Sequence, residues 1–112
     1  MKIGAIITGD IVDSTKMMPD ERNHMLRLLK SLPEMLSSLS KIELEVFRGD
    51  SFQARIFDVS ESLDVALAIR ACIRSNVFAE YKQQWDARIS LGIGQLDYQH
   101  CTLATSDGEA YR

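Results

Sequence analysis

A short apolar run at residues 2–8 ends abruptly at the pair Gly9 and Asp10. The run has no polar alternation, which is typical of a central strand that helices cover on at least one face. A polar turn follows, so such a strand would place the carboxylate of Asp10 at an edge of the sheet. A second pair, Gly49 and Asp50, lies between two runs that alternate in polarity and marks the tip of a hairpin. The function that these residues support depends on whether the two aspartates meet.

Apolar spacing predicts two helices. The first begins at Pro19 and carries an apolar stripe from Met25 to Leu39, with Pro33 expected to kink it near Lys30. The second follows a capping pattern that begins at Asp58. Its predicted buried stripe consists of Leu63, Ala66, Leu67, Ile69, Ile73 and Val77. Alternation of apolar and polar residues predicts three more strands, at residues 42–46, 52–56 and 87–94.

The last part of the chain reads less regularly. Residues 102–105 read as a short strand, and residues 106–109 form a capping box that announces a helix. Because the chain ends at Arg112, barely a turn later, we expect a C-terminally truncated domain, the N-terminal part of a longer protein.

The predicted order βαββαβ describes a single domain over residues 1–112. Right-handed crossovers make the first two strands parallel, with the third, antiparallel strand between them. Two helices on one face of this mixed, largely antiparallel sheet give a ferredoxin-like α+β sandwich. In that topology the end of the first strand and the hairpin share one edge of the sheet. Asp10 and Asp50 are therefore expected to lie close together.

Two adjacent carboxylates repel each other unless a cation lies between them. Mg²⁺ or Mn²⁺ would resolve that conflict with hard oxygen ligands and leave room for the phosphates of a nucleotide. The backbone N–H groups of the turn from Ile11 to Ser14 are placed to hold phosphate oxygens. Ser14, which has no nearby base, is interpreted as a turn cap. The alternative is that both aspartates only stabilise turns, as Gly-Asp pairs commonly do.

Three segments resemble the class III nucleotidyl cyclase domain. They are residues 10–12 with Thr15, residues 49–52, and residues 88–94. The likeness is stronger to the SatD family of bacterial proteins, which has this fold and similar segments at residues 8–12, 47–53 and 107–111. The resemblance implies that Asp10 and Asp50 bind metal through their side chains and Ile11 through its backbone carbonyl. It further implies phosphate contacts from residues 12–15 (Val12, Asp13, Ser14 and Thr15), and a homodimer.

The chain also departs from the cyclase pattern. A purine-selecting Lys is replaced by Val46 and Phe47 ahead of the second Gly-Asp pair, and Asp13 replaces a usual Gly. Asp13 is either a third metal ligand or a negative charge that opposes a triphosphate. The helix that carries the cyclase transition-state residues is missing. The resemblance therefore favours a SatD-like regulatory domain with a degenerate metal and nucleotide site. The alternative is an active metal-dependent cyclase or phosphotransfer enzyme when full length and dimeric.

The composition limits the kinds of partner that the chain is expected to bind. The net charge of −3 and the pI of about 5.3 leave no basic footprint for nucleic acid. We expect nucleic-acid binding only through a missing C-terminal region, if at all. No apolar run approaches the roughly 20 residues that cross a bilayer, so a cytoplasmic protein without membrane contact is expected. Arg48 and Arg55 flank the hairpin. Arg48 is a candidate phosphate ligand, and a solvated strand charge is the alternative for both arginines.

Overall fold

The computed structural model describes residues 3–75 and 84–95. These residues form four strands, two α-helices and two short 3₁₀ helices. The elements are β1 (Ile3–Ile11), η1 (Ser14–Lys16), α1 (Pro19–Met35), β2 (Ile42–Phe47), β3 (Ser51–Ile56), η2 (Val59–Glu61), α2 (Ser62–Ser75) and β4 (Ala87–Gln95). The four strands predicted within these ranges and both predicted helices are present, with ends that differ from the prediction by a few residues.

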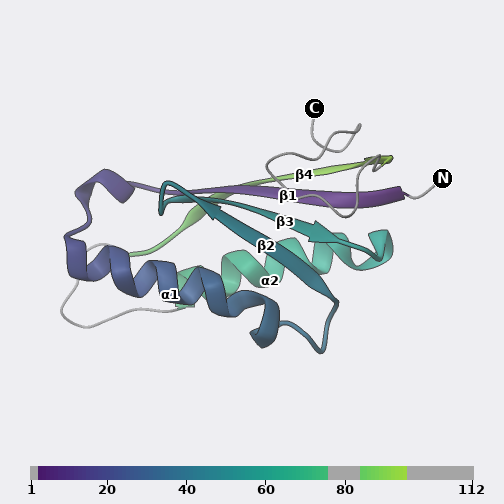
Figure 1. The fold of residues 1–112 in the computed structure, drawn as a ribbon, viewed down its shortest axis with the longest axis horizontal. Helices are drawn as coiled ribbons and strands as arrows, with labels where there is room; N and C mark the ends of the chain where they lie inside the picture. Colours follow the sequence, from purple (N-terminus) through teal and green to yellow (C-terminus); the bar gives the residue numbers. More distant parts are fainter. Residues whose placement is uncertain (1–2, 76–83, 96–112) are drawn as a thin grey trace.

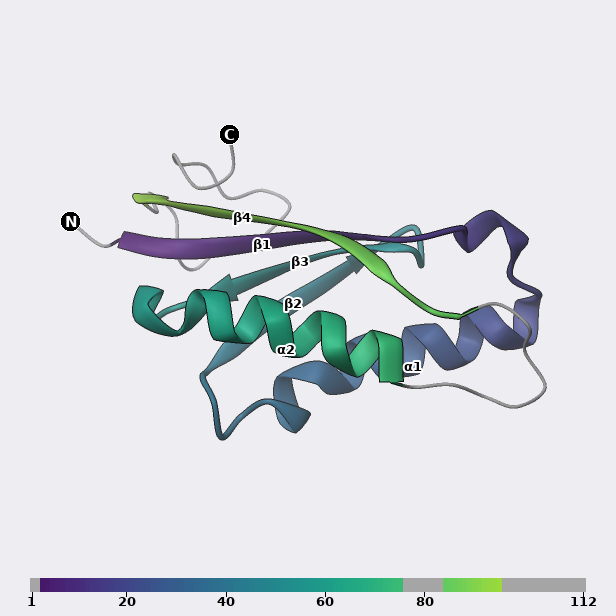
Figure 2. The same cartoon turned by 180° about the vertical axis from the view of Figure 1, so that it is seen from behind.

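The sheet has the order β2-β3-β1-β4, and every neighbouring pair is antiparallel. β1 and β2 therefore run in the same direction with β3 between them, as predicted. Both helices cover one face of the sheet, as Figures 1 and 2 show from opposite sides. The fold is thus the predicted two-layer α+β sandwich.

Side chains alternate between the two faces of the sheet along each strand. On β1, Ala5, Ile7 and Ile11 are buried in the core beneath the helices, whereas Thr8 and Asp10 are exposed on the opposite face. Gly9 belongs to the helix-facing set and lies opposite Phe52 in the register of β1 and β3. A methyl group at position 9 would overlap the Phe52 ring, so the ring needs a glycine on the neighbouring strand.

The hairpin between β2 and β3 turns at Arg48 and Gly49. Their φ angles are 57° and 77°, so both central residues adopt left-handed backbone. Two successive left-handed residues are the signature of a type I′ turn, which matches the twist of the flanking strands. The amide of Asp50 donates to the Phe47 carbonyl at 3.3 Å and closes the turn. This geometry delivers Asp50 to the start of β3.

The predicted helical stripes are only partly correct. α1 continues through Pro33 and ends at Met35; Leu39 lies in the following turn and is 41% exposed. In α2, Ala66, Ile69 and Ile73 are buried as predicted. Leu63 and Leu67 are each 61% exposed, while the unpredicted Val65 is fully buried. The buried face of α2 is therefore rotated away from the predicted one.

Arg55 is not the solvated charge that alternation suggests. It is fully buried, and its Nη1 lies 3.6 Å from Glu43 Oε1 on β2. Its guanidinium also lies 5.9 Å from the centre of the Phe57 ring. Directly opposite pairing of Glu43 and Arg55 across β2 and β3 explains the ion pair.

Some expectations lie outside the described residues. These are Val77, the short strand at residues 102–105 and the capping box at residues 106–109. Among the residues that are described, no helix combines the length and hydrophobicity needed to span a membrane.

Candidate functional site

The register of β1 and β3 places the two aspartates in adjoining positions. Asp10 is the cross-strand partner of Ser51, the residue that follows Asp50. The amide of Ile11 donates to the Asp50 carbonyl at 2.8 Å, which extends the pairing by one step. Both aspartates therefore lie at the same edge of the sheet, the arrangement that the topology predicts.

Each carboxylate accepts a hydrogen bond from a different serine. Ser51 Oγ donates to Asp10 Oδ1 at 2.6 Å, and Ser14 Oγ donates to Asp50 Oδ2 at 2.9 Å. Ser14 is therefore not a turn cap, because its hydroxyl bonds to the hairpin and not to its own turn. The bond joins the chain just after β1 to the start of β3. The other two oxygens, Asp10 Oδ2 and Asp50 Oδ1, accept no hydrogen bond from the described residues.

The turn after β1 uses its first two amides for structure. Ile11 donates to Asp50, and the Val12 amide donates to the Asp86 carbonyl at 2.9 Å. These two N–H groups are thus not available to a phosphate, unlike the expectation from sequence. Within the described ranges, the amides of Ser14 and Thr15, which open η1, have no acceptor.

Asp13 adopts the conformation that a glycine would adopt most readily. Its φ of 56° and ψ of 33° place it in the left-handed region, where Asp is tolerated better than most side chains. Its carboxylate is half-exposed and lies 4.0 Å from Lys16 Nζ. No three His, Cys, Asp or Glu side chains within residues 3–75 and 84–95 lie close enough together to hold a metal ion. Asp13 therefore does not complete a three-carboxylate site with Asp10 and Asp50.

The donor set nevertheless suits a hard divalent cation. Two carboxylate oxygens without hydrogen-bond donors and nearby backbone carbonyls are the ligands that Mg²⁺ and Mn²⁺ take. With only two carboxylates, the protein would leave several coordination positions to water or to substrate phosphates, which is how Mg²⁺ is usually held. Asp10 and Asp50 thus carry the type of ligand that such an ion takes.

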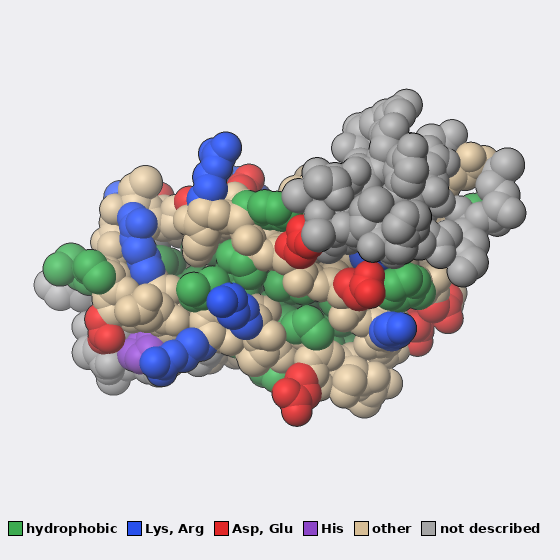
Figure 3. Space-filling view, viewed as in Figure 1, with side chains coloured by type: hydrophobic (Ala, Val, Ile, Leu, Met, Phe, Trp, Pro, Cys, Tyr) green, Lys and Arg blue, Asp and Glu red, His purple; other side chains and the backbone are tan. Residues whose placement is uncertain are grey.

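Two arginines lie near this edge. Arg48 is exposed in the hairpin turn and makes no ion pair with a described residue. Arg88, which the sequence did not single out as a site residue, is the cross-strand partner of Asp10 on β4. Its position in the register is the signal that would have identified it. Figure 3 shows Lys and Arg side chains gathered toward the end of the molecule that carries the hairpin turn and the start of α1.

A second polar cluster, formed by Arg70, Arg74 and Asp86, is hydrogen-bonded to the turn after β1. Arg70 donates to Asp86 in a bidentate manner at 2.9 and 3.0 Å, and Arg74 donates to the same carboxylate at 2.9 Å. Asp86 also accepts the Ala87 amide at 2.8 Å. The side-chain hydrogen bond from Arg70 is the main cause that holds the pKa of the Asp86 carboxyl well below its ordinary value. Because the Asp86 carbonyl binds Val12, the cluster links α2 to the turn beside the aspartates.

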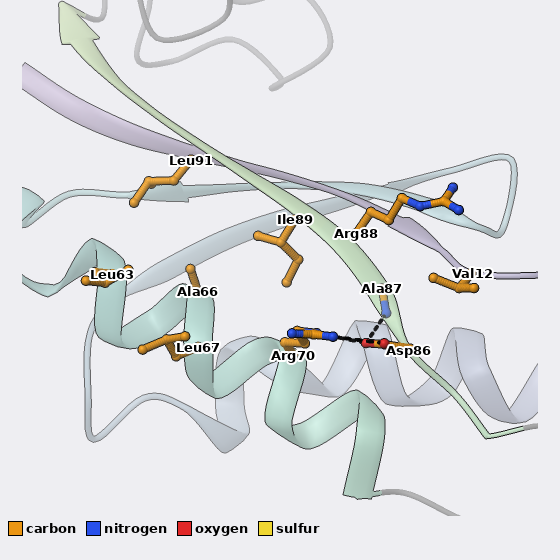
Figure 4. A pocket seen from close by; sticks show the side chains of 10 residues that line it. All are labelled: Val12, Leu63, Ala66, Leu67, Arg70, Asp86, Ala87, Arg88, Ile89 and Leu91. Atoms are coloured by element: carbon orange, nitrogen blue, oxygen red, sulfur yellow. Dashed lines mark hydrogen bonds and ion pairs between the residues drawn. The ribbon is translucent and has the colours of Figure 1, made fainter.

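Figure 4 shows Arg70 and Asp86 of this cluster at one end of a groove between α2 and β4. The groove has a volume of about 580 Å³. Its walls are mainly apolar and include Leu63, Leu67, Ile89 and Leu91. Arg88 points away from the Arg70 and Asp86 pair, toward the sheet face that carries Asp10.

No known family profile matches the chain, and a search of curated proteins found no relative. Solved structures, in contrast, match with high similarity of fold. One is the active GGEEF domain of a diguanylate cyclase from Vibrio cholerae, with a TM-score of 0.68 and 16% identity over 82% of this chain. The chain spans 62% of the length of that domain.

Two further matches come from other nucleotidyl cyclases. The guanylate cyclase domain of RhGC from Catenaria anguillulae, in complex with GTP, gives a TM-score of 0.64 at 12% identity, covering 96% of this chain and 75% of that one. An adenylate cyclase from Trypanosoma brucei gives 0.62 at 14% identity, covering 96% and 64%. The chain therefore has the fold of the nucleotidyl cyclase catalytic domain.

Proposed function

We propose that this chain is a cyclase-like domain that binds a divalent cation and a nucleoside triphosphate at the edge formed by β1 and the β2–β3 hairpin. The observation that carries the proposal is the pairing of Asp10 with Ser51 and of Ile11 with Asp50. It brings the backbones of the two aspartates to adjoining positions, which supports a site shared by their carboxylates. The cation would be Mg²⁺ or Mn²⁺, held by Asp10, Asp50 and the Ile11 carbonyl. It would neutralise the carboxylates and bind phosphate oxygens.

The surrounding residues take supporting roles in this proposal. Ser51 and Ser14 orient the two carboxylates, so that one oxygen of each remains for the cation. The amides of Ser14 and Thr15 donate hydrogen bonds to phosphate oxygens, while Arg48 and Arg88 approach from the hairpin and from β4. Val12 and Asp13 shape the turn, and the negative charge of Asp13 weakens the binding of phosphate.

We propose a regulatory role for the site, like that of SatD-like proteins, and not catalysis by this chain alone. Asp13 adds negative charge beside the phosphates, and no third acidic ligand joins the two aspartates within the described residues. A second copy would complete the site if the domain pairs as the cyclase resemblance implies. One similar structure is described as a non-canonical dimeric guanylyl cyclase domain from Blastocladiella emersonii. The homodimer, and further chain beyond residue 112, belong to this proposal.

Isothermal titration of the full chain with GTP, in the presence and absence of Mn²⁺, tests the binding site. We expect binding that requires Mn²⁺ and is abolished by Asp10→Asn and by Asp50→Asn. Asp58→Asn is the matched control, because Asp58 is a carboxylate that caps η2 beyond the other end of β3. Absence of binding to the folded wild-type chain would refute the proposal, as would equal binding by all three variants.

A product assay separates regulation from catalysis. The full chain, at a concentration that saturates the site, is incubated with GTP or ATP and Mn²⁺, and cyclic nucleotide and pyrophosphate are measured. We expect metal-dependent binding without product. Product that disappears in Asp50→Asn would instead establish the active cyclase or phosphotransfer alternative.

A further inference from the structure

Asp86, the residue that precedes β4, accepts hydrogen bonds from several parts of the chain. Arg70 on α2 donates to both of its carboxylate oxygens, at 2.9 and 3.0 Å, and Arg74 donates to Oδ2 at 2.9 Å. The Ala87 amide donates to Oδ1 at 2.8 Å. Dashed lines in Figure 4 mark the bonds from Arg70 and Ala87. Both carboxylate oxygens are therefore engaged, and the forked guanidinium of Arg70 fixes their plane.

The backbone carbonyl of the same residue holds the turn after β1. It accepts a hydrogen bond from the Val12 amide at 2.9 Å. One residue earlier, the Ile11 amide donates to the Asp50 carbonyl at 2.8 Å. Because β3 and β4 flank β1 on opposite sides, these two bonds hold the end of β1 between the starts of its neighbours.

The groups assigned to the phosphates begin two residues beyond Val12. The backbone is left-handed at Asp13, and η1 then begins at Ser14. Ser14 Oγ donates to Asp50 Oδ2 at 2.9 Å, and the amides of Ser14 and Thr15 are the proposed phosphate ligands. A rotation of the backbone at Val12 would turn these amides and that hydroxyl together, because only Asp13 separates them from Val12.

The segment that leads into β4 is anchored on two sides. Trp85 Nε1 donates to the buried carboxylate of Glu21 on α1 at 2.7 Å. Asp86 is bound instead to α2, whose side chains Ile69 and Ile73 are fully buried in the core. Because Trp85 keeps the segment attached when the bonds to α2 are weakened, the domain should stay folded while the Asp86 carbonyl shifts.

We propose that Asp86, held by Arg70 and Arg74, is a positioning residue for the candidate metal and phosphate site. The inference rests on the proposed function and adds a residue that touches neither the cation nor the nucleotide. Asp86 acts through its carbonyl on Val12, and through Val12 on the two amides that open η1. Affinity for the triphosphate thus depends on contacts made by the second half of α2.

Charge alone is the competing explanation, since arginines attract phosphates and an aspartate repels them. Two substitutions distinguish it from positioning. Arg70→Lys keeps the positive charge but lacks the fork that binds both oxygens; charge alone predicts no change, and positioning predicts weaker binding. Asp86→Asn removes a negative charge, so charge alone predicts tighter binding of a triphosphate, whereas positioning again predicts weaker binding.

Isothermal titration of the full chain with GTP, in the presence of Mn²⁺, measures both variants. We expect each to bind roughly two- to thirtyfold more weakly than the wild-type chain, as for other residues that influence a site without contacting its ligand. Arg27→Lys, at an exposed position on α1, is the matched control and should bind as the wild-type chain does. Urea denaturation should show that the variants are folded under the conditions of the titration.

A double-mutant cycle tests the route through the turn. Arg70→Lys and Ser14→Ala both release the same turn, so their losses of affinity should not be additive. Additive losses would overturn the route, and unchanged affinity in Arg70→Lys or tighter binding in Asp86→Asn would overturn the positioning role itself. Each of these results leaves the proposed function intact. Absence of binding by the folded wild-type chain would refute the proposed function, and this inference with it.

Discussion

Gly9 is the residue whose replacement the packing opposes most directly. Phe52 is fully buried and lies opposite Gly9 across β1 and β3, and a Cβ at position 9 would overlap its ring. Neither backbone can move apart without breaking the strand pairing that holds Asp10 beside Ser51. Gly9 thus permits the packing of the core, while Asp10, which follows it, lies at the edge of the sheet.

We expect Gly9→Ala to lower the free energy of unfolding by about 1–3 kcal/mol or more, because it overpacks the core. Urea denaturation measures the loss. The double variant with Phe52→Leu provides the control: removal of the ring should make the alanine less costly than it is in the wild-type background. Additive effects of the two substitutions would contradict this explanation.

Asp13 offers a test of charge beside the proposed phosphates. Asp13→Gly removes a carboxylate and suits the left-handed backbone, so the turn should be retained. Affinity for GTP with Mn²⁺ should rise by roughly threefold to tenfold, because the loss of one nearby negative charge removes a repulsion of about 1 kcal/mol. Asp13→Asn, which also removes the charge, should give a similar rise. A weaker affinity in both variants would mean that Asp13 contributes to binding.

Two polar links join elements that are distant in sequence. Trp85 Nε1 donates to Glu21 Oε2 at 2.7 Å, and both side chains are buried. This bond ties the first turn of α1 to the segment that leads into β4. The Asp86 cluster ties α2 to the same segment and to Val12. Both helices are therefore anchored at the end of the sheet where the candidate site lies.

Two substitutions of Glu21 should distinguish the contribution of its hydrogen bond to stability from the contribution of its packing. Glu21→Leu deprives the buried indole N–H of this acceptor, and we expect a loss of about 1–3 kcal/mol in the free energy of unfolding. Glu21→Gln keeps an acceptor oxygen and should lose less. Urea denaturation followed by the fluorescence of the single tryptophan measures both. Equal losses would show that the bond to Trp85 contributes little.

The Asp86 cluster predicts a pH dependence of stability. Because its arginine partners lower the pKa of Asp86 in the folded chain, the stabilisation is present above the ordinary value of 3.8 and is lost as the pH falls below it. Asp86→Asn should therefore be less stable than the wild-type chain at neutral pH. The difference should narrow as the pH falls from about 4. Denaturation midpoints of both proteins between pH 7 and pH 3 measure this. A difference that stays constant would contradict the assignment.

The two-layer architecture leaves one flank of α2 uncovered by the described residues. Leu63 and Leu67 are each 61% exposed along the groove against β4, whereas the core of the sandwich lies between the sheet and the opposite flank of α2. The arrangement of layers, visible in Figure 2, thus leaves Leu63 and Leu67 exposed, although Ala66, Ile69 and Ile73 of the same predicted stripe are buried. Exposed leucines should contribute little to the stability of the domain.

We expect Leu67→Lys to change the free energy of unfolding by about 0.5 kcal/mol or less. Leu29→Ala, at a fully buried position in α1, should cost about 2–5 kcal/mol. Chemical denaturation at two protein concentrations measures both. If Leu67→Lys proves as costly as Leu29→Ala, the groove is covered in solution by a second copy or by residues outside the described ranges.

The elements themselves follow from local patterns. Alternation identified β2, β3 and β4, the apolar run identified β1, and the Arg48-Gly49 turn between two alternating runs identified the hairpin. Handedness of the crossovers then placed β3 between β1 and β2 and brought the two Gly-Asp pairs to one edge. These inferences succeed because strand period, turn conformation and crossover chirality are properties of short stretches of chain.

The hydrogen-bond partners of the polar side chains and the buried faces of the helices could be determined only from the tertiary structure. The burial of Arg55, the exposure of Leu63 and Leu67, and the bond from Ser14 to Asp50 all depend on how segments far apart in sequence rotate against one another. Helical spacing identifies a stripe, but packing against the sheet selects which flank of that stripe is buried. A polar side chain likewise bonds to whichever donor or acceptor the tertiary structure brings within reach. Local pattern thus sufficed to place the two aspartates, and only the packed structure decided what surrounds them.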